Sequence, residues 1–374
     1  MNAAAKLLVP GKKRSSRRRL RAAVFAAAAS LWCAAAQAQI GVSSEPMPGP
    51  PLVMCTSTEL MKQVPCPDSA LFFFEGQALV QKAFYAKDFK ALDELYDQWC
   101  SGKERFPDGR WKLSQYGDGL NKNFEAWNTW TKDLNDIQSW QQARPQSNAA
   151  LYAEAIYWRA YAWKARGGGY ADTVAKEGWE LFRERLDKSL EILTKLHARG
   201  RGCAAPYALL LSVMTDQGAP ESKLAEVFQE GAREHPEYHN IYFAMARHYE
   251  PRWGGSAARY ERFALQVAKQ TRAFEGMGMY ARLYWLVDSR RGGIPFTNDP
   301  VQAPHWSKLQ AGYEDLMRLY PSSMHNLGKY AGVACRSSDG VLYRSLRSKI
   351  AGYEGSAEML DPIDVCDRRH KWTP

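Results

Sequence analysis

The stretch YEPRWGGSAARYERFALQV, residues 249–267, holds the end of one helical pattern, a sharp break and the start of the next pattern. Pro251 cannot continue a helix, and it biases the residue before it away from helical backbone angles. The glycine pair at 254–255 permits a reversal of the chain, and Ser256 is a good N-cap for the following helix. That helix has an apolar stripe at helical spacing, made of Tyr260, Phe263, Ala264 and Val267. The stretch therefore predicts a helical hairpin.

The same alternation of apolar stripes and short breaks extends from about residue 70 to residue 350. Strand signals of alternating β-branched residues are nearly absent. Each stripe can be buried only if one hairpin stacks on the next. Pro206 and Pro236 lie 30 residues apart, which is close to a tetratricopeptide period, but the period then drifts. We therefore predict an all-α fold, a tetratricopeptide-like α-solenoid of helical hairpins with a right-handed course.

Residues 1–38 have the composition of a cleaved export signal. A basic region, KKRSSRRRLR at residues 12–21, precedes a 15-residue apolar run at 22–36 and the small-x-small site Ala36-Gln37-Ala38. An uncleaved membrane anchor is the alternative, although the run is shorter than the roughly 20 residues that span a bilayer. The string SRRRLR also resembles a twin-arginine export motif. We expect cleavage after Ala38 and a periplasmic or secreted protein that is not integral to the membrane; the signal does not separate these two locations or the two export routes.

The predicted signal accounts for most of the basic charge. It contains eight of the 50 Lys and Arg residues and none of the 40 Asp and Glu residues, so the cleaved chain carries a net charge of +2 rather than +10. A nucleic-acid-binding domain usually has a strongly basic face. We therefore predict no nucleic-acid partner.

Further boundaries follow from composition. Residues 39–68 form a Pro-rich tail with a disulfide loop, residues 69–145 an N-terminal helical region and residues 146–374 the helical-repeat region. Six cysteines remain after cleavage, an even number that favours disulfides in an oxidising compartment. We predict the pairs Cys55–Cys66 and Cys335–Cys366 and leave the pairing of Cys100 and Cys203 open. Buried free thiols are the alternative.

Signatures of common enzyme and cofactor sites are missing from the sequence. It contains no H-E-x-x-H, phosphate loop, G-x-S-x-G or EF-hand loop, and no C-x-x-C. Residues 276–281 match G-x-G-x-x-A but follow a helix rather than a strand. His235, His239 and His248 cluster in sequence, and we interpret them as surface or hydrogen-bonded histidines rather than metal ligands. We predict no catalytic residue, no metal and no cofactor.

Several segments resemble a known bacterial family. They are PRWGGS (251–256), GMYARLYW (278–285), YWRAYAWKARGGGYADTV (157–174), the helix at 179–193 and YAGVACRSSD (330–339). Together they resemble the domain-of-unknown-function family DUF4034 over about residues 106–366. The resemblance implies a tetratricopeptide-like helical architecture in exported or cell-envelope proteins. The family supplies no agreed activity, so it assigns no role to any residue.

The aromatic content gives the best indication of function. The sequence has 13 Trp and 19 Tyr, and Trp, Tyr and Arg are enriched at binding hot spots. One aromatic group is Trp111, Tyr116, Trp127 and Trp130. The candidate binding group is Tyr157, Tyr161, Arg252, Trp253, Tyr280, Arg282 and Trp285. The alternative is that these aromatic side chains pack between helices, with Trp253 buried under its turn.

Two functions remain open. The first is a non-enzymatic scaffold that binds a protein or peptide in a groove lined by aromatic residues and arginines. The second is a cell-wall or glycan-active enzyme, or a glycan-binding protein, with an aromatic cleft. For such an enzyme, Glu154 and Glu250 are the candidate acid and base, and they would have to face one cleft.

Overall fold

The computed structural model describes residues 54–56, 63–65, 70–126, 128–200, 202–291, 304–352, 359 and 361–373. The chain divides into two compact units, residues 1–44 and 45–374, and every described residue belongs to the second. The predicted signal, together with Cys66 and Trp127, lies outside the described residues.

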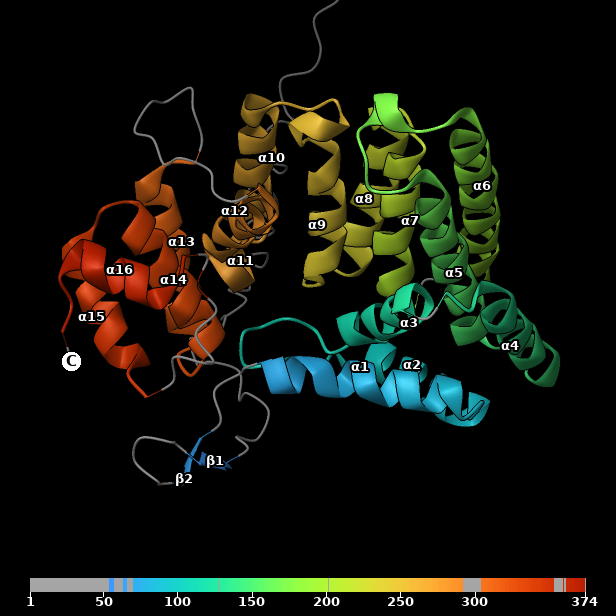
Figure 1. The fold of residues 1–374 in the computed structure, drawn as a ribbon, viewed down its shortest axis with the longest axis horizontal. Helices are drawn as coiled ribbons and strands as arrows, with labels where there is room; N and C mark the ends of the chain where they lie inside the picture. The colour runs from blue at the N-terminus through green and yellow to red at the C-terminus, as the bar shows by residue number, and fades with distance from the viewer. Residues whose placement is uncertain are drawn as a thin grey trace, which may run out of the picture. The chain divides into compact units, whose positions relative to one another are not determined.

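The described residues form an all-α fold, which confirms the prediction from the helical stripes (Figure 1). The helices are α1 (Ala70–Tyr85), α2 (Phe89–Gly102), α3 (Ser114–Ala126), α4 (Trp130–Ala143), α5 (Asn148–Arg166), α6 (Lys176–Arg199), α7 (Ala205–Asp216), α8 (Glu221–Glu234), α9 (His239–His248), α10 (Ala257–Gln270), α11 (Arg272–Glu275), α12 (Gly278–Arg291), α13 (Trp306–Leu319), α14 (Met324–Arg336), α15 (Gly340–Ile350) and α16 (Ile363–His370). Two short 3₁₀ helices, η1 (Ala171–Thr173) and η2 (Pro251–Trp253), lie between them.

A small antiparallel strand pair lies in the tail that precedes the helices. It consists of β1 (Met54–Thr56) and β2 (Gln63–Pro65), with Cys55 opposite Val64. Because Cys66 lies outside the described residues, the Cys55–Cys66 pair stays a prediction.

Several helices begin at a side chain that accepts a hydrogen bond from a free backbone N–H of the first turn. Ser147 accepts from the amide of Ala150 at 2.9 Å, and Ser256 accepts from the amide of Arg259 at 3.2 Å. Asp88, Ser323 and Asp339 do the same for α2, α14 and α15. The local sequence therefore fixes where these helices start.

The packing of the helices follows a regular order. Consecutive helices pack together, as in α5 with α6, α7 with α8 and α8 with α9, and alternate helices pack as well, in the series α1, α3, α5, α7 and α9. Stacked hairpins produce this combination of contacts. The tetratricopeptide-like solenoid and its right-handed course stay predictions.

The turn at residues 249–256 has the conformation that its sequence indicates. Pro251–Trp253 form η2, and Gly254 has a left-handed φ of 86°. A Cβ atom on Gly255 would lie 2.0 Å from the carbonyl oxygen of Tyr249, so only glycine fits there. Trp253 is half-buried rather than a buried wedge.

Two disulfides connect distant parts of the chain. The predicted pair Cys335 and Cys366 forms one and closes 31 residues; Cys100 and Cys203 form the other and close 103 residues. Disulfides persist in oxidising compartments. The two disulfides are therefore compatible with an oxidising location outside the cytoplasm. None of the helices in the part of the chain described above is long and apolar enough to cross a membrane.

Candidate functional site

The two candidate tyrosines of α5 pack against the start of α4. Tyr157 is buried, and its hydroxyl donates to the carbonyl oxygen of Trp130 at 2.9 Å. Tyr161 stacks on the Trp130 ring with centroids 4.7 Å apart, and the guanidinium carbon of Arg185 lies 3.3 Å from the tyrosine ring centroid. These contacts join α4, α5 and α6.

Of the three candidates on α12, Arg282 and Trp285 are three residues apart and share a face of the helix, whereas Tyr280, two residues before Arg282, points away from them. Tyr280 is buried and donates to Glu261 at 2.9 Å. Arg282 is buried with its Nε atom 3.5 Å from Glu275. Trp285 is half-buried. None of the three lines the cavities described next.

Arg252 and Trp253 do lie at a cavity. Two adjoining cavities of about 320 and 590 Å³ share four lining residues, Asn121, Arg159, Arg247 and Arg252. We call their combined space the arginine groove. Residues of α3, α5, α7, α9 and η2 line it, together with Tyr238 just before α9 and Leu286 of α12.

One wall of the arginine groove is basic. Arg159 donates from Nε to Asp216 at 2.8 Å, and Arg247 forms an ion pair with the same carboxylate at 2.7 Å. Arg252 donates to Glu250 at 2.9 Å. A planar guanidinium has five N–H donors, so an arginine that pairs with a buried carboxylate can also donate to a ligand.

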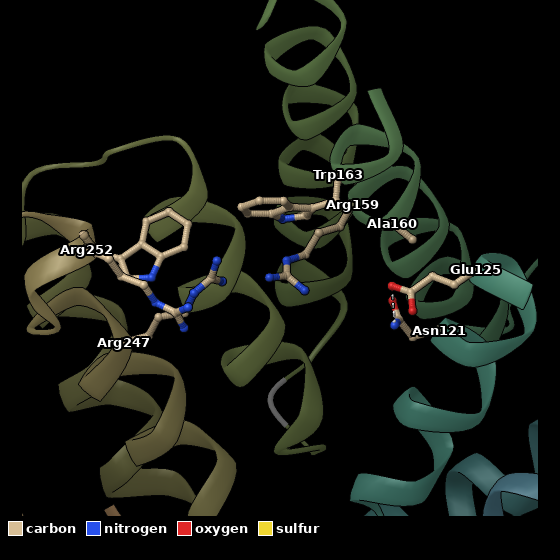
Figure 2. A pocket seen from close by; sticks show the side chains of 8 residues that line it. Asn121, Glu125, Arg159, Ala160, Trp163, Arg247 and Arg252 are labelled. Atoms are coloured by element: carbon tan, nitrogen blue, oxygen red, sulfur yellow. Dashed lines mark hydrogen bonds between the residues drawn. The ribbon is translucent and has the colours of Figure 1, made fainter. Parts of the chain in front are cut away.

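The opposite wall is the acidic face of α3. Asp118, Asn121 and Glu125 lie at i, i+3 and i+7, which places them on one face of the helix. Figure 2 shows Asn121 and Glu125 directed toward the same space as the guanidinium groups of Arg159 and Arg247. Asn121 donates to Glu125 at 2.8 Å.

Asp118 lines the groove and is exposed. Desolvation raises the pKa of its carboxyl to about 6, against the charges of Arg110 and Lys122, which lower it. The acidic wall therefore carries a carboxyl whose pKa lies above its ordinary value.

The groove tryptophans already have neighbours on their rings. The guanidinium carbon of Arg247 lies 3.9 Å from the Trp253 ring centroid, and Trp163 meets Trp253 edge-on at 5.9 Å. Trp163 donates its indole N–H to Asp216 at 2.9 Å. The buried indole N–H of Trp253 has no hydrogen-bond partner among the described residues. The groove therefore offers donors more than open aromatic faces.

The two carboxylates considered for an enzyme do not face this groove together. Glu154 accepts hydrogen bonds from Gln141 at 2.6 Å and from Trp158 at 3.2 Å, and it does not line the groove. Glu250 is buried behind Arg252. The carboxylates that do line the groove, Asp118 and Glu125, are both on α3.

The clustered histidines have different surroundings from one another. His239 is buried with its Nε2 atom 2.8 Å from Glu275. His248 lies 3.9 Å from Glu221, and the His235 ring contacts Tyr207. Within the described residues, one group could be mistaken for a metal site, Cys335, Asp361 and Cys366, but its two sulfur atoms are joined in a disulfide.

Sequence reasoning missed the residues that make the basic wall beside Arg252. Arg159 and Trp163 are one helical turn apart on α5, and this i, i+4 spacing of an arginine and a tryptophan could have been read from the sequence. They lie on a different face of α5 from Tyr157. Asp216 gave no such signal, because the ion pairs it forms with α5 and α9 depend on tertiary contacts.

Comparisons with curated proteins and with solved structures gave no match. One family model matches residues 77–242. The match begins earlier than residue 106, where the resemblance was expected to start, and it ends before PRWGGS, so it includes Arg159 and Trp163 but not Arg247 or Arg252. The matching family is described as "Domain of unknown function (DUF4034)", which confirms the family resemblance expected from the sequence.

Proposed function

We propose that this protein is a non-enzymatic helical-repeat binding module of the cell envelope, which holds a protein or peptide segment in the arginine groove. One observation carries the proposal: the groove is lined by the alternate helices α3, α5, α7 and α9, and not by α4, α6 or α8. Repeat proteins bind extended partners on a surface to which each repeat contributes one element.

The proposed location in the periplasm or outside the cell rests on two features. The sequence of residues 1–38 is typical of an export signal, and the two disulfides suit an oxidising compartment. The mature chain would begin at Gln39.

A site-specific photo-crosslink tests the proposal. A photoreactive amino acid replaces Ser212, which lines the groove on α7, and in a second variant replaces Ser139 on α4. Each serine hydroxyl donates to a carbonyl oxygen one turn back at 2.8 Å, so the two sites are locally matched. The tagged precursor is expressed in its own host and irradiated, and the crosslinked products are identified by mass spectrometry.

We expect a protein crosslinked through position 212 and not through position 139. Equal capture at both positions, or capture of glycan alone at position 212, would reject the proposal. The intact mass of the purified protein also reports whether residues 1–38 have been removed.

A further inference from the structure

On the basic wall of the arginine groove, guanidinium N–H donors face the cavity. The carboxylates that pair with them lie behind, away from solvent. The side chains of Asp216 and Glu250 are 0% and 1% exposed, whereas those of Arg159 and Arg252 are 24% and 49% exposed. A ligand therefore meets guanidinium N–H groups rather than the carboxylates that balance them. Guanidinium groups bind a planar carboxylate through paired N–H donors.

The acidic wall presents carboxylates on the other side of the arginine groove. Asp118 and Glu125 are both exposed and lie about 10 Å apart along α3, at a rise of about 1.5 Å per residue. Each lines a cavity to which Arg159, Arg247 and Arg252 also contribute. Carboxylates on one wall repel a polyanion that the arginines alone would accept, and they attract a cation.

The rings in the groove argue against a sugar as the main ligand. Sugar-binding sites commonly present an open aromatic face for stacking, but the guanidinium of Arg247 covers the Trp253 ring, and Trp163 meets that ring edge-on. The groove thus suits a ligand that carries both acceptors and donors.

We infer that the ligand of the arginine groove is a peptide segment that places a carboxylate on Arg252 and its neighbouring arginines and a basic side chain against Asp118 and Glu125. The carboxylate belongs to an Asp or Glu side chain or to the C-terminus of the peptide. This inference rests on the proposed function and adds the chemistry of the bound segment.

Affinity selection from a defined peptide library tests it. The mature protein, residues 39–374, is incubated with a soluble synthetic library of random decapeptides, made both as free acids and as C-terminal amides. Retained peptides are sequenced by mass spectrometry. The variants are Arg252→Gln, Asp118→Asn and, as the matched control, Arg259→Gln. Arg259 also pairs with a glutamate, Glu221, but lies outside the groove lining.

We expect the retained peptides to be enriched in a carboxylate with Lys or Arg a few residues away. Arg252→Gln should weaken the binding of the best peptide by at least about tenfold, and Asp118→Asn should remove the preference for Lys and Arg while keeping that for the carboxylate. Arg259→Gln should behave as the unchanged protein, and matching melting temperatures for the variants exclude misfolding as the cause.

Three results would overturn the inference. Retained peptides without a carboxylate preference, or binding that Arg252→Gln leaves unchanged, would show that the chemistry is wrong while the groove still binds peptides. An absence of retained peptides would reject a short segment as the ligand, and the crosslink at position 212 then decides whether the groove binds a protein at all.

Discussion

A side chain at position 255 has no room, because the turn folds back on Tyr249, the residue that follows the last residue of α9. A Cβ atom added there would lie 2.0 Å from the carbonyl oxygen and 2.2 Å from the carbonyl carbon of Tyr249, and backbone atoms cannot rotate away. We therefore expect Gly255→Ala to lower the free energy of unfolding by about 2 kcal/mol or more. Urea unfolding followed by tryptophan fluorescence measures this change.

The neighbouring glycine provides the control. Gly254 has a φ of 86° but nothing within 4 Å of an added Cβ, so Gly254→Ala should cost only about 1 kcal/mol, for the left-handed backbone. Equal losses for the two variants would contradict the steric interpretation of this turn.

At the scale of the elements, a buried charged cluster joins α9, α11, α12 and the end of α13. Glu275 on α11 accepts hydrogen bonds from His239 at 2.8 Å and from Tyr320 at 2.7 Å, and it lies 3.5 Å from Arg282. Burial alone would raise the pKa of Glu275, but the charges of Arg282 and His239 and the two hydrogen bonds lower it to about 2, from an ordinary value of 4.5. The ionised carboxylate is therefore more favourable in the folded chain than in the unfolded one.

This lowered pKa predicts a pH dependence. A carboxyl whose folded pKa lies below its unfolded value stabilises the fold above the unfolded pKa, and the contribution is lost as pH falls from about 4.5 toward 2. Glu275→Gln should lower the free energy of unfolding by roughly 3 kcal/mol at pH 7, and the difference from the unchanged protein should narrow at pH 3. Urea unfolding at both pH values measures this difference.

The control is Glu226→Gln, at an exposed pair with Lys223, which should change the free energy of unfolding little at either pH. A Glu275→Gln difference that is constant with pH would refute the prediction.

The elements were the most predictable part of the molecule, since apolar stripes, prolines and capping residues act locally. The site was less predictable because it depends on which faces of the helices meet. Tyr157 and Tyr161 share one face of α5, whereas Arg159 and Trp163, which line the groove, lie on another. Grouping Tyr280, Arg282 and Trp285 by residue type ignored their spacing on α12, which turns Tyr280 away from the other two. Arg252 lies at the groove because the turn that carries it packs beside α5, a tertiary contact that has no local signal.

At the scale of the whole chain, the pairing of Cys100 with Cys203 could not be predicted from the sequence, because six cysteines allow 15 pairings. The bond connects the C-terminal end of α2 to the segment before α7, and it closes 103 residues that include α3, α4, α5 and α6. The basic residue Arg159 and the whole acidic wall lie inside this closed loop. The disulfide therefore limits how far Arg159 can separate from the acidic wall in the unfolded chain, whereas Arg247 and Arg252 lie outside the loop.

Removing this disulfide should destabilise the protein more than removing the shorter one. The entropy of closing 103 residues corresponds to roughly 5 kcal/mol, and that of closing 31 residues to roughly 4 kcal/mol. We expect the double variant Cys100→Ser with Cys203→Ser to lose more free energy of unfolding than Cys335→Ser with Cys366→Ser, when both are measured by urea unfolding of oxidised protein. Adding a reductant should lower the stability of each double variant further, because each retains the other disulfide. A larger loss for the Cys335 and Cys366 pair would mean that packing around the sulfur atoms, rather than loop closure, sets the contribution of these bonds.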